Sequence, residues 1–410
     1  MIRQLVPVET SLTTEALVAW CARRPAATSP FTEDRMALAV QVGRRLAADP
    51  TARRVPALQA LAFWMRRGEI FRLRDEFTRE TSSGIINVPR GTVLHFPPTN
   101  VDTLFVYSWL LAMLAGNRNL VRLSSRAGAD ATVLVRVINA ALANHGGPLA
   151  DETVMCTYGH DEGITTALSA QCDVRVIWGG DASVAAIRRI PLAPRSIELA
   201  FPDRFSFAVF RADAVVAMDA PSLEELADRF YNDTYWFDQL GCSSPRVVAW
   251  VGTDDATTDA STRFWTTVRA RIVARAYRVD VGTALAKWTY AYRTVLDGAA
   301  DRFQWAANEL AVVTLRGLEM MPREHPGGGT VLEIRIPVLD ALIPVLTSRD
   351  QTLAHYGFRL EELQAFVRQA GARSFDRVVP VGEALQFGKV WDGFDLLGQF
   401  TRQVVLGSNI

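Results

Sequence analysis

The chain has 410 residues, of which 49% are hydrophobic and 21% are charged, and its formal net charge at pH 7 is zero. This is the ordinary mixture of a packed soluble protein, and the length exceeds what one hydrophobic core usually serves, so we expect at least two domains. The balanced charge, without a long basic block, argues against a nucleic-acid partner and against a polybasic membrane anchor, so small neutral partners or a cofactor fit better.

The cysteines and the apolar runs favour a cytoplasmic protein. Cys21, Cys156, Cys172 and Cys242 form no CxxC pair and no metal-binding spacing, so we predict neither a disulfide framework nor a metal site. The N-terminus lacks the long apolar core of a secretory signal. The longest apolar run, residues 104–115, is well short of the roughly 20 residues that cross a bilayer, so it predicts a buried helix and no membrane span.

Residues 1–80 predict a helical region that packs on the domain after it. Residues 14–75 are rich in Ala, Leu and Arg at helical spacing and contain few β-branched residues. From residue 84 the sequence GIINVPRGTVLHFPPTN instead predicts strand, turn and strand, because Pro89 and Gly91 punctuate it.

Residues 81–215 predict a domain in which strands alternate with helices. After the first strands, this alternation comprises helix 101–115, strand 119–125, helix 131–147, strand 154–158, helix 161–170, strand 174–178 and helix 181–189. Such a series implies a parallel sheet with right-handed crossovers and helices on both faces. Ligands bind to sheets of this kind at the carboxyl ends of the strands.

Two of these strand ends carry residues suited to a dinucleotide. One strand end offers hydrogen-bond donors and cations for ribose hydroxyls or a 2′-phosphate, namely Arg122, Ser124, Ser125 and Arg126. The other offers Gly179 and Gly180, where a backbone can approach a pyrophosphate at a helix N-terminus. A double glycine also fits a plain tight turn, and the sequence GxGxxG is absent.

Residues 216–390 predict a second domain, which contains Cys242. Ser222 and Glu225 have capping-box spacing and apolar residues recur at helical intervals, so we expect a helix over 222–238 that Gly241 ends. Residues 246–251 predict a strand. Cys242 therefore lies on a loop, where catalytic groups concentrate, although an isolated cysteine is also a common buried hydrophobe. Burial is the role that we expect for the other three cysteines.

The remainder of the chain predicts mostly helix over 252–320, a glycine loop leading into a strand over 325–336, and a helix over 359–371. Residues 391–410 predict a closing segment. Its residues 401–406 could form an edge strand available to a second subunit, so we expect a homo-oligomer.

In this order, the segments over about residues 55–410 resemble the aldehyde dehydrogenase superfamily. Within it they are most similar to the acyl-CoA reductases typified by the fatty-acid reductase of bacterial bioluminescence, the LuxC-like family. The resemblance rests on PRGTVLHFPPTN, LLAMLAGNRNLVRLSS, VRVIWGGDASVAAIRR and DQLGCSSPRVV, with LQALAFWMRR, HPGGGT and WDGFDLL typical of the reductase subgroup. It implies an α/β protein with a Rossmann-type cofactor domain, an α/β catalytic domain and a small oligomerisation element.

The resemblance also implies roles for the matching positions. Cys242 would be the nucleophile and Asn100 the oxyanion donor. Arg122 would lie at the adenosine ribose, and Gly179 and Gly180 near the cofactor phosphates.

Several departures from the dehydrogenase pattern matter. Arg122 stands where dehydrogenases usually have lysine, and with Arg126 nearby this favours NADPH, with NADH as the alternative. The glutamate motif Glu-Leu-Gly-Gly has at best Glu198 as its counterpart, without the glycines. Asp102 replaces the proline usual two residues after the asparagine.

These implications support the hypothesis of NADPH-dependent reduction of an acyl thioester to the aldehyde through a covalent thioester on Cys242. The acyl group would arrive on CoA, on a carrier protein or on an acyl-protein synthetase partner. Two alternatives stay open: a dehydrogenase that oxidises a free aldehyde, and a non-catalytic scaffold of the same fold. Acid/base roles for Glu198 and His325 are also open.

Overall fold

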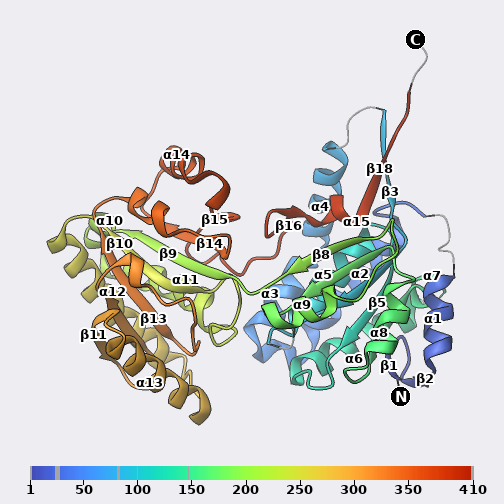
Figure 1. Cartoon of the computed structure of the whole chain (residues 1–410), viewed down its shortest axis with the longest axis horizontal. Coiled ribbons are helices and arrows are strands. Elements are labelled where there is room, and N and C mark those ends of the chain that lie inside the picture. The colour runs from blue at the N-terminus through green and yellow to red at the C-terminus, as the bar shows by residue number, and fades with distance from the viewer. Residues whose placement is uncertain (1, 24–27, 81–83, 99, 146, 408–410) are drawn as a thin grey trace. The chain divides into compact units, whose positions relative to one another are not determined.

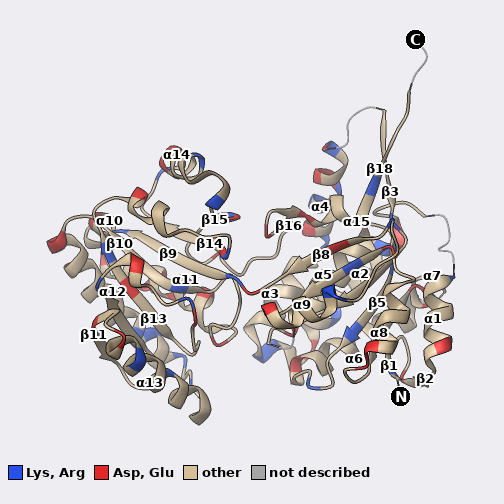
Figure 2. Ribbon diagram, viewed as in Figure 1, with Lys and Arg blue, Asp and Glu red and all other residues tan. Residues whose placement is uncertain are grey.

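The computed structural model describes residues 2–23, 28–80, 84–98, 100–145 and 147–407. The chain divides into two compact units, both visible in Figure 1. Unit 1 combines the chain through Asp203 with the C-terminal segment from Phe387, and unit 2 is the continuous segment Arg204–Gln386. Within the described residues, each unit is built around its own seven-stranded sheet. Acidic and basic residues are interspersed over both units, as Figure 2 shows.

The sheet of unit 1 has the strand order β2-β1-β6-β5-β4-β7-β8. Its strands are Ile2–Val6 (β1), Thr10–Leu12 (β2), Thr92–Phe96 (β4), Arg118–Leu123 (β5), Thr153–Thr157 (β6), Val174–Trp178 (β7) and Ile197–Phe201 (β8). The strands from β6 to β8 in this order run parallel, which confirms the expected parallel sheet. The antiparallel pair β1 and β2 is a correction, because the sequence analysis treated residues 1–80 as helical.

Helices cover the sheet of unit 1. They are Thr14–Ala22 (α1), Glu33–Ala48 (α2), Pro56–Trp64 (α3), Arg67–Arg79 (α4), Thr103–Leu114 (α5), Ala129–His145 (α6), Pro148–Asp151 (α7), Glu162–Ser169 (α8) and Asp181–Arg188 (α9). Helix α5 is buried along its whole length, as its apolar sequence predicts. No helix in the described part of the chain is long and apolar enough to span a bilayer. Cys21, Cys156 and Cys172 lie in one buried hydrophobic cluster, so these thiols serve packing.

The sheet of unit 2 has the order β11-β12-β13-β10-β9-β14-β15. Its strands are Phe205–Arg211 (β9), Pro245–Val251 (β10), Ala300–Trp305 (β11), Ala311–Leu315 (β12), Thr330–Ile336 (β13), Asp350–Tyr356 (β14) and Arg377–Pro380 (β15). Its α-helices are Ala212–Val216 (α10), Ala220–Tyr235 (α11), Asp254–Ala274 (α12), Val281–Leu296 (α13) and Leu360–Ala370 (α14). Helices α12 and α13 make up most of residues 252–320, as expected, whereas strands β11 and β12 in the same segment were not predicted.

Both faces of the unit 2 sheet are buried, because successive side chains of a strand point to opposite faces. Along β10, Val248 and Trp250 join a hydrophobic cluster that includes residues of α11 and α12. Val247 and Ala249 join a second cluster, which includes residues of α13 and α14. The strands are therefore continuous apolar runs rather than alternating ones.

The boundary between the units differs from the one that the sequence analysis drew between residues 215 and 216. Strand β9 pairs in parallel with β10 and β14, so it belongs to the second sheet, and the division falls after Asp203. The return to unit 1 comes after Gln386 rather than after residue 390. Hydrophobic pattern alone could not show which sheet the strand joins.

The C-terminal segment completes unit 1. It contains Val390–Trp391 (β16), Phe394–Asp395 (β17), Leu396–Phe400 (α15) and Thr401–Val405 (β18). The predicted strand at residues 401–406 is present as β18, and it pairs antiparallel with Ile85–Pro89 (β3) of the same chain.

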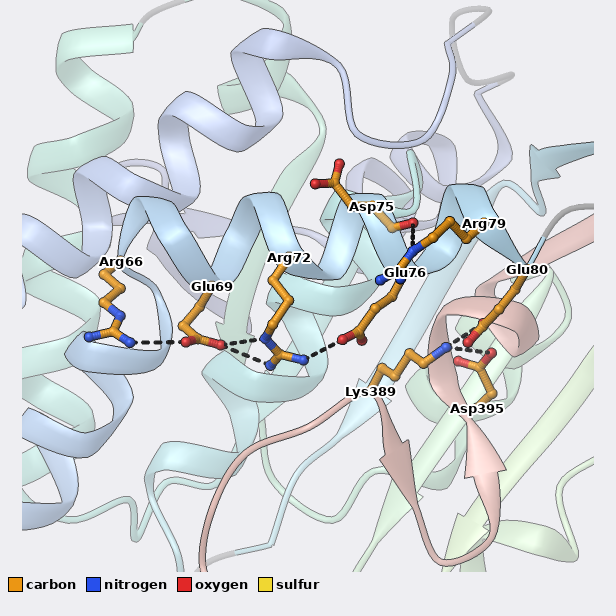
Figure 3. Close-up of polar contacts among 9 residues, drawn as sticks. All are labelled: Arg66, Glu69, Arg72, Asp75, Glu76, Arg79, Glu80, Lys389 and Asp395. Atoms are coloured by element: carbon orange, nitrogen blue, oxygen red, sulfur yellow. Dashed lines mark hydrogen bonds and ion pairs between the residues drawn. The ribbon is translucent and has the colours of Figure 1, made fainter.

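Ion pairs hold the start of this segment, as Figure 3 shows. Lys389 pairs with Glu80, at the end of α4, and its Nζ lies 3.8 Å from a carboxylate oxygen of Asp395. Along α4 itself, Arg72 pairs with Glu69 at 2.8 Å and with Glu76 at 2.6 Å.

Candidate active site

The connections between the parallel strands of unit 1 reverse direction between β4 and β7. From β4 the chain moves through α5 to β5 on one side, whereas from β7 it moves through α9 to β8 on the other. Because β4 and β7 are neighbours, the carboxyl ends of these two strands border a topological switch point. Open α/β sheets bind their ligands in the crevice at such a point.

The residues that the sequence analysis selected for the cofactor follow these strand ends. Ser124, Ser125 and Arg126 come directly after β5, and Gly179 and Gly180 directly after β7. Since β5, β4 and β7 are adjacent and parallel, their carboxyl ends share one edge of the sheet. The topology therefore brings these residues to the same edge.

Asn100 follows the strand between those two. It lies exposed on the connection from β4 to α5, and therefore at the same carboxyl edge of the unit 1 sheet. Asp102, two residues later, accepts a hydrogen bond from the Ala131 backbone N–H at 3.1 Å. The Asp102 carboxylate thus accepts a hydrogen bond from the first turn of α6, where a negative charge is favourable.

Arg122 lies one residue before the end of β5 and is anchored to the next strand. Its Nη2 donates to the Tyr158 carbonyl at 2.9 Å, and its guanidinium lies 5.3 Å from the centre of the Tyr158 ring. Ser124 accepts a hydrogen bond from the Arg126 backbone N–H at 3.1 Å, which closes a local turn. Arg122 is half-buried and Arg126 is exposed.

Gly180 is the N-cap residue of α9, and no side chain caps this helix. No atom lies within 4 Å of the position that a Cβ of Gly180 would occupy. The first backbone N–H groups of α9 therefore have no capping side chain, and a helix N-terminus favours anions. Together with the strand ends beside it, this arrangement fits the pyrophosphate of a dinucleotide.

Glu198, the candidate for a water-activating base, is held in ion pairs. It accepts from Arg175 Nε at 2.8 Å with one carboxylate oxygen and from Arg188 Nε at 2.9 Å with the other. Both oxygens of the carboxylate are thus engaged by guanidinium groups, which is the geometry of a structural ion pair.

In unit 2, Cys242 lies on the connection between α11 and β10, where the sequence analysis placed it. The helix itself differs from the expectation. It spans Ala220–Tyr235, and its N-cap is Asp219, whose side chain accepts from the Ser222 backbone N–H at 3.0 Å. The predicted capping residue, Ser222, therefore lies inside the helix. Aspartate is as good an N-cap as serine, so the pattern alone could not choose between them.

The turn that carries Cys242 has an unusual backbone. Asp238 and Gln239 both adopt left-handed conformations, with φ of 50° and 61°. Residues other than glycine adopt this conformation at a cost, and such strain persists only where the surroundings enforce it. Here the side chain of Gln239 closes the turn, because its Nε2 donates to the Pro245 carbonyl at 2.8 Å.

Neighbouring strands hold the turn from the side. Ser206 of β9 donates from its hydroxyl to the Cys242 carbonyl at 2.7 Å, and accepts from the Thr352 backbone N–H at 3.2 Å. Ser243 donates to Gln351 Oε1 of β14 at 2.9 Å. The residues on both sides of Cys242 are buried, whereas Cys242 itself is half-buried. A rigid support therefore surrounds a partly accessible thiol.

The sequence analysis missed most of this support. Gln239 stands in the quoted segment DQLGCSSPRVV and could have been selected from it. Ser206 and Gln351 carry no such signal, since they contact the turn only through the pairing of β9 with β10 and β14.

His325, the other residue with an open role, supports the glycine loop before β13. Its Nδ1 accepts from the Gly327 backbone N–H at 3.1 Å, so that nitrogen carries no proton. Burial, assisted by the charge of Arg246, holds the pKa of His325 well below its usual range. The ring is therefore neutral at pH 7.

Known proteins show which family these features belong to. The acyl-CoA reductase (LuxC) family model matches residues 65–269, half of the chain. The chain belongs to this family. It is also 27% identical over 167 residues to the long-chain acyl-protein thioester reductase of Aliivibrio fischeri. That match covers 40% of this chain and 33% of the relative, so the matched region spans about a third of the relative's length.

Solved structures show the fold. The aldehyde dehydrogenase of Mycobacterium tuberculosis, solved as a complex with NAD+, has a TM-score of 0.69 at 15% identity over 98% of this chain and 92% of that one. Aldehyde dehydrogenase 21 of Physcomitrella patens, solved with the reaction product succinate, has a TM-score of 0.67 at 12% identity over 97% of this chain and 92% of that one. These likenesses confirm the expected aldehyde-dehydrogenase fold for this acyl-CoA reductase family member.

Proposed function

We propose that this protein reduces an acyl thioester to the aldehyde with NADPH, and that Cys242 is the nucleophile. The observation that carries the proposal is the partly accessible thiol of Cys242, on a turn that Gln239 and Ser206 hold rigid, in a member of the acyl-CoA reductase family. A nucleophile needs this combination, because a thiol must be reachable and also fixed in position.

The first step is a thiol exchange. The Cys242 thiolate forms a bond to the thioester carbonyl carbon, and the carbon–sulfur bond to the incoming thiol carrier breaks, which leaves an acyl group on Cys242. Nucleophile and leaving group are both thiolates, so the exchange is nearly balanced in free energy. The departing thiolate takes a proton from solvent.

The oxyanion that develops in this step needs hydrogen-bond donors. We assign the Cys242 backbone N–H and the Asn100 side-chain amide to this role. Ser244 is a further candidate, because its buried hydroxyl has no hydrogen-bond partner among the described residues and it lies two positions after Cys242. Loss of one such donor typically costs about 2.7–4 kcal/mol of barrier.

The strand ends of unit 1 would hold the cofactor. The uncapped N-terminus of α9 at Gly180 suits the pyrophosphate. Arg122 and Arg126 suit the adenosine ribose, and their two positive charges favour a 2′-phosphate and therefore NADPH over NADH. When bound, a reduced nicotinamide supplies a hydride to the acyl carbon. Cys242 then leaves the thiohemiacetal carbon as a thiolate, and the aldehyde is released.

No step in this sequence activates a water molecule. Glu198 has both carboxylate oxygens engaged by Arg175 and Arg188, which makes it a poor general base. This favours thioester reduction over the oxidation of an aldehyde to a free acid, because the second reaction requires a base that activates water.

The test is a single-turnover reaction with acyl-CoA and NADPH. We expect a covalent acyl group on Cys242, detected by mass spectrometry, and then NADPH consumption. Cys242→Ala should abolish both. The matched control is Cys156→Ala, since Cys156 is a buried core residue, and it should keep the parental rate. NADPH consumption at the parental rate by Cys242→Ala would refute the proposal.

The same assay identifies the acyl donor. Short and long acyl-CoA, an acyl group on a carrier protein, and an acyl group on a synthetase would each be supplied, and the Aliivibrio fischeri relative, named for acyl-protein thioesters, makes the last donor a natural choice. Oxidation of a free aldehyde to the acid without CoA would favour the dehydrogenase alternative. We also infer a homo-oligomer, for which sedimentation of the intact protein is the test.

A further inference from the structure

Three consecutive glycines precede β13, and all of them adopt left-handed conformations. The φ values of Gly327, Gly328 and Gly329 are 75°, 60° and 74°. A Cβ at Gly327 would lie 2.6 Å from the Asp238 carbonyl oxygen, and a Cβ at Gly329 would lie 2.2 Å from the Glu309 carbonyl oxygen. The loop thus packs closely against the Cys242 turn on one side and against the β11–β12 connection on the other.

Lys287 of α13 anchors this loop through a hydrogen bond. Its side chain is fully buried. Its ammonium donates to the Asn308 carbonyl at 2.6 Å and also to the Gly328 carbonyl, so it joins the β11–β12 connection to the glycine loop. The Nζ also lies 5.6 Å from the centre of the Trp305 ring. Burial disfavours the charged form and lowers the pKa of Lys287 to about 7, so the two carbonyl contacts are what hold this amine in place. The negative charge of Glu309 favours its protonated form.

The glycine loop is also bonded to the turn that carries Cys242. The Gly328 backbone N–H donates to the Asp238 carbonyl at 2.7 Å. Asp238 is the first of the two left-handed residues before Cys242, and its side chain accepts from the Tyr277 hydroxyl at 2.7 Å. Asp238, at the start of the turn, therefore accepts one hydrogen bond from the glycine loop and one from Tyr277.

We propose that Lys287 is a positioning residue for Cys242. Its ammonium fixes the glycine loop, and the loop fixes Asp238 and with it the strained turn on which the thiol lies. This inference rests on the proposed role of Cys242 as the nucleophile. Lys287 touches no reacting atom in it. Its effect should appear in the rate of acylation, because displacements of about 1 Å can slow such steps by as much as 100-fold.

Lysine suits this position better than arginine. The ammonium is a compact charge whose donors can reach two carbonyls at once, whereas a guanidinium is larger and planar. The chain otherwise uses arginine for its cations, and Lys287 and Lys389 are its two lysines. Lys389, which pairs with Glu80 and Asp395 in unit 1 (Figure 3), therefore provides a matched control.

The test compares Lys287→Met with the parent in the intact protein. Methionine keeps much of the side-chain shape and removes the charge and the donors. We expect single-turnover acylation at saturating acyl-CoA to fall about 10- to 100-fold, with the dissociation constant for NADPH unchanged. Lys389→Met should acylate at the parental rate. Thermal unfolding is followed in parallel, and Lys287→Gln, which keeps one amide donor, replaces the Met variant if that variant does not fold.

A double-mutant cycle separates positioning from a general loss of stability. Tyr277→Phe removes the second hydrogen bond to Asp238, so its effect on acylation should be non-additive with that of Lys287→Met. Rates within twofold of the parent in the Lys287 variants, or strictly additive effects in the cycle, would overturn the role of Lys287. A parent that forms no acyl-enzyme on Cys242 would overturn the proposed function, and this inference with it.

Discussion

Asp233 is a buried carboxyl group on α11, a few residues before the Cys242 turn. Its two oxygens accept from the Gly382 N–H at 2.6 Å and from the Ala384 N–H at 3.0 Å, so it holds the segment that leads out of unit 2. Burial raises the pKa of Asp233 to about 7, against these two hydrogen bonds, which lower it. Its protonation therefore couples the stability of unit 2 to pH.

The sign of this coupling follows from the two pKa values. In the unfolded chain an aspartate titrates at about 3.9, so between about pH 4 and about pH 7 the folded state binds more protons than the unfolded state. The contribution of Asp233 to stability is complete below about pH 4 and is lost as the pH rises through about 7. We expect the free energy of unfolding of the parent, relative to Asp233→Asn, to fall by up to about 1.4 kcal/mol per pH unit in this window. Urea unfolding at a series of pH values measures it, and a difference that is constant or rises with pH would contradict it.

At the scale of elements, the glycine loop before β13 joins three segments that are distant in sequence. Tyr235 of α11, the 306–310 connection and α13 all approach it so closely that the loop has no room for side chains. The loop is therefore a packing junction of unit 2 and more than a turn between strands.

Alanine substitutions at two glycines with similar φ values should therefore differ in their effect on stability, because only one of these glycines lies in the junction. Gly329→Ala would place a Cβ 2.2 Å from a backbone oxygen, whereas Gly371, with φ of 58°, has no atom within 4 Å of the position that its Cβ would occupy. Gly371→Ala should cost only backbone strain, about 1–3 kcal/mol. Gly329→Ala adds a backbone clash that no side-chain movement can relieve, so we expect it to leave unit 2 largely unfolded. Near-UV circular dichroism and thermal melts compare the two, and equal melting temperatures would contradict the expectation.

At the scale of the whole molecule, unit 2 is continuous in sequence and unit 1 is not. Unit 2 has its own sheet, with a hydrophobic cluster on each face. Unit 1 needs the C-terminal segment, because β18 pairs with β3, and Asn117 donates from Nδ2 to the Phe400 carbonyl at 3.0 Å. The side chains of Leu396, Leu397 and Phe400 are also buried.

This difference predicts how fragments behave. The fragment of residues 204–386 should fold alone, with a cooperative thermal transition. The fragment of residues 1–203 should not, because it leaves β3 without its partner and exposes the apolar surface that α15 covers. Circular dichroism and limited proteolysis of the two fragments provide the measurement. A stable, protease-resistant fragment of residues 1–203 would contradict the expectation.

Local patterns in the sequence were sufficient to predict much of the fold of this protein. The alternation of strand and helix over residues 101–189 was sufficient for the parallel sheet, since periodicity reports which faces are buried. The apolar run of α5 was sufficient for a buried helix. The turn between α11 and β10 placed Cys242 on a loop, and the order of several motifs was sufficient for the aldehyde-dehydrogenase fold.

Only the tertiary structure decided the rest. It assigned β9 to the second sheet and added β1 to the first, because strand pairing depends on partners far away in sequence. It paired Glu198 with two arginines, bonded Ser206 to the Cys242 carbonyl and bonded Lys287 to the glycine loop, and each of these contacts joins residues from separate elements. Residue patterns report local conformation and burial, whereas such contacts exist only after the strands have paired. For this reason the candidate nucleophile could be predicted from the sequence, and Gln239 beside it could have been, whereas the contacts of Ser206 and Gln351 could not.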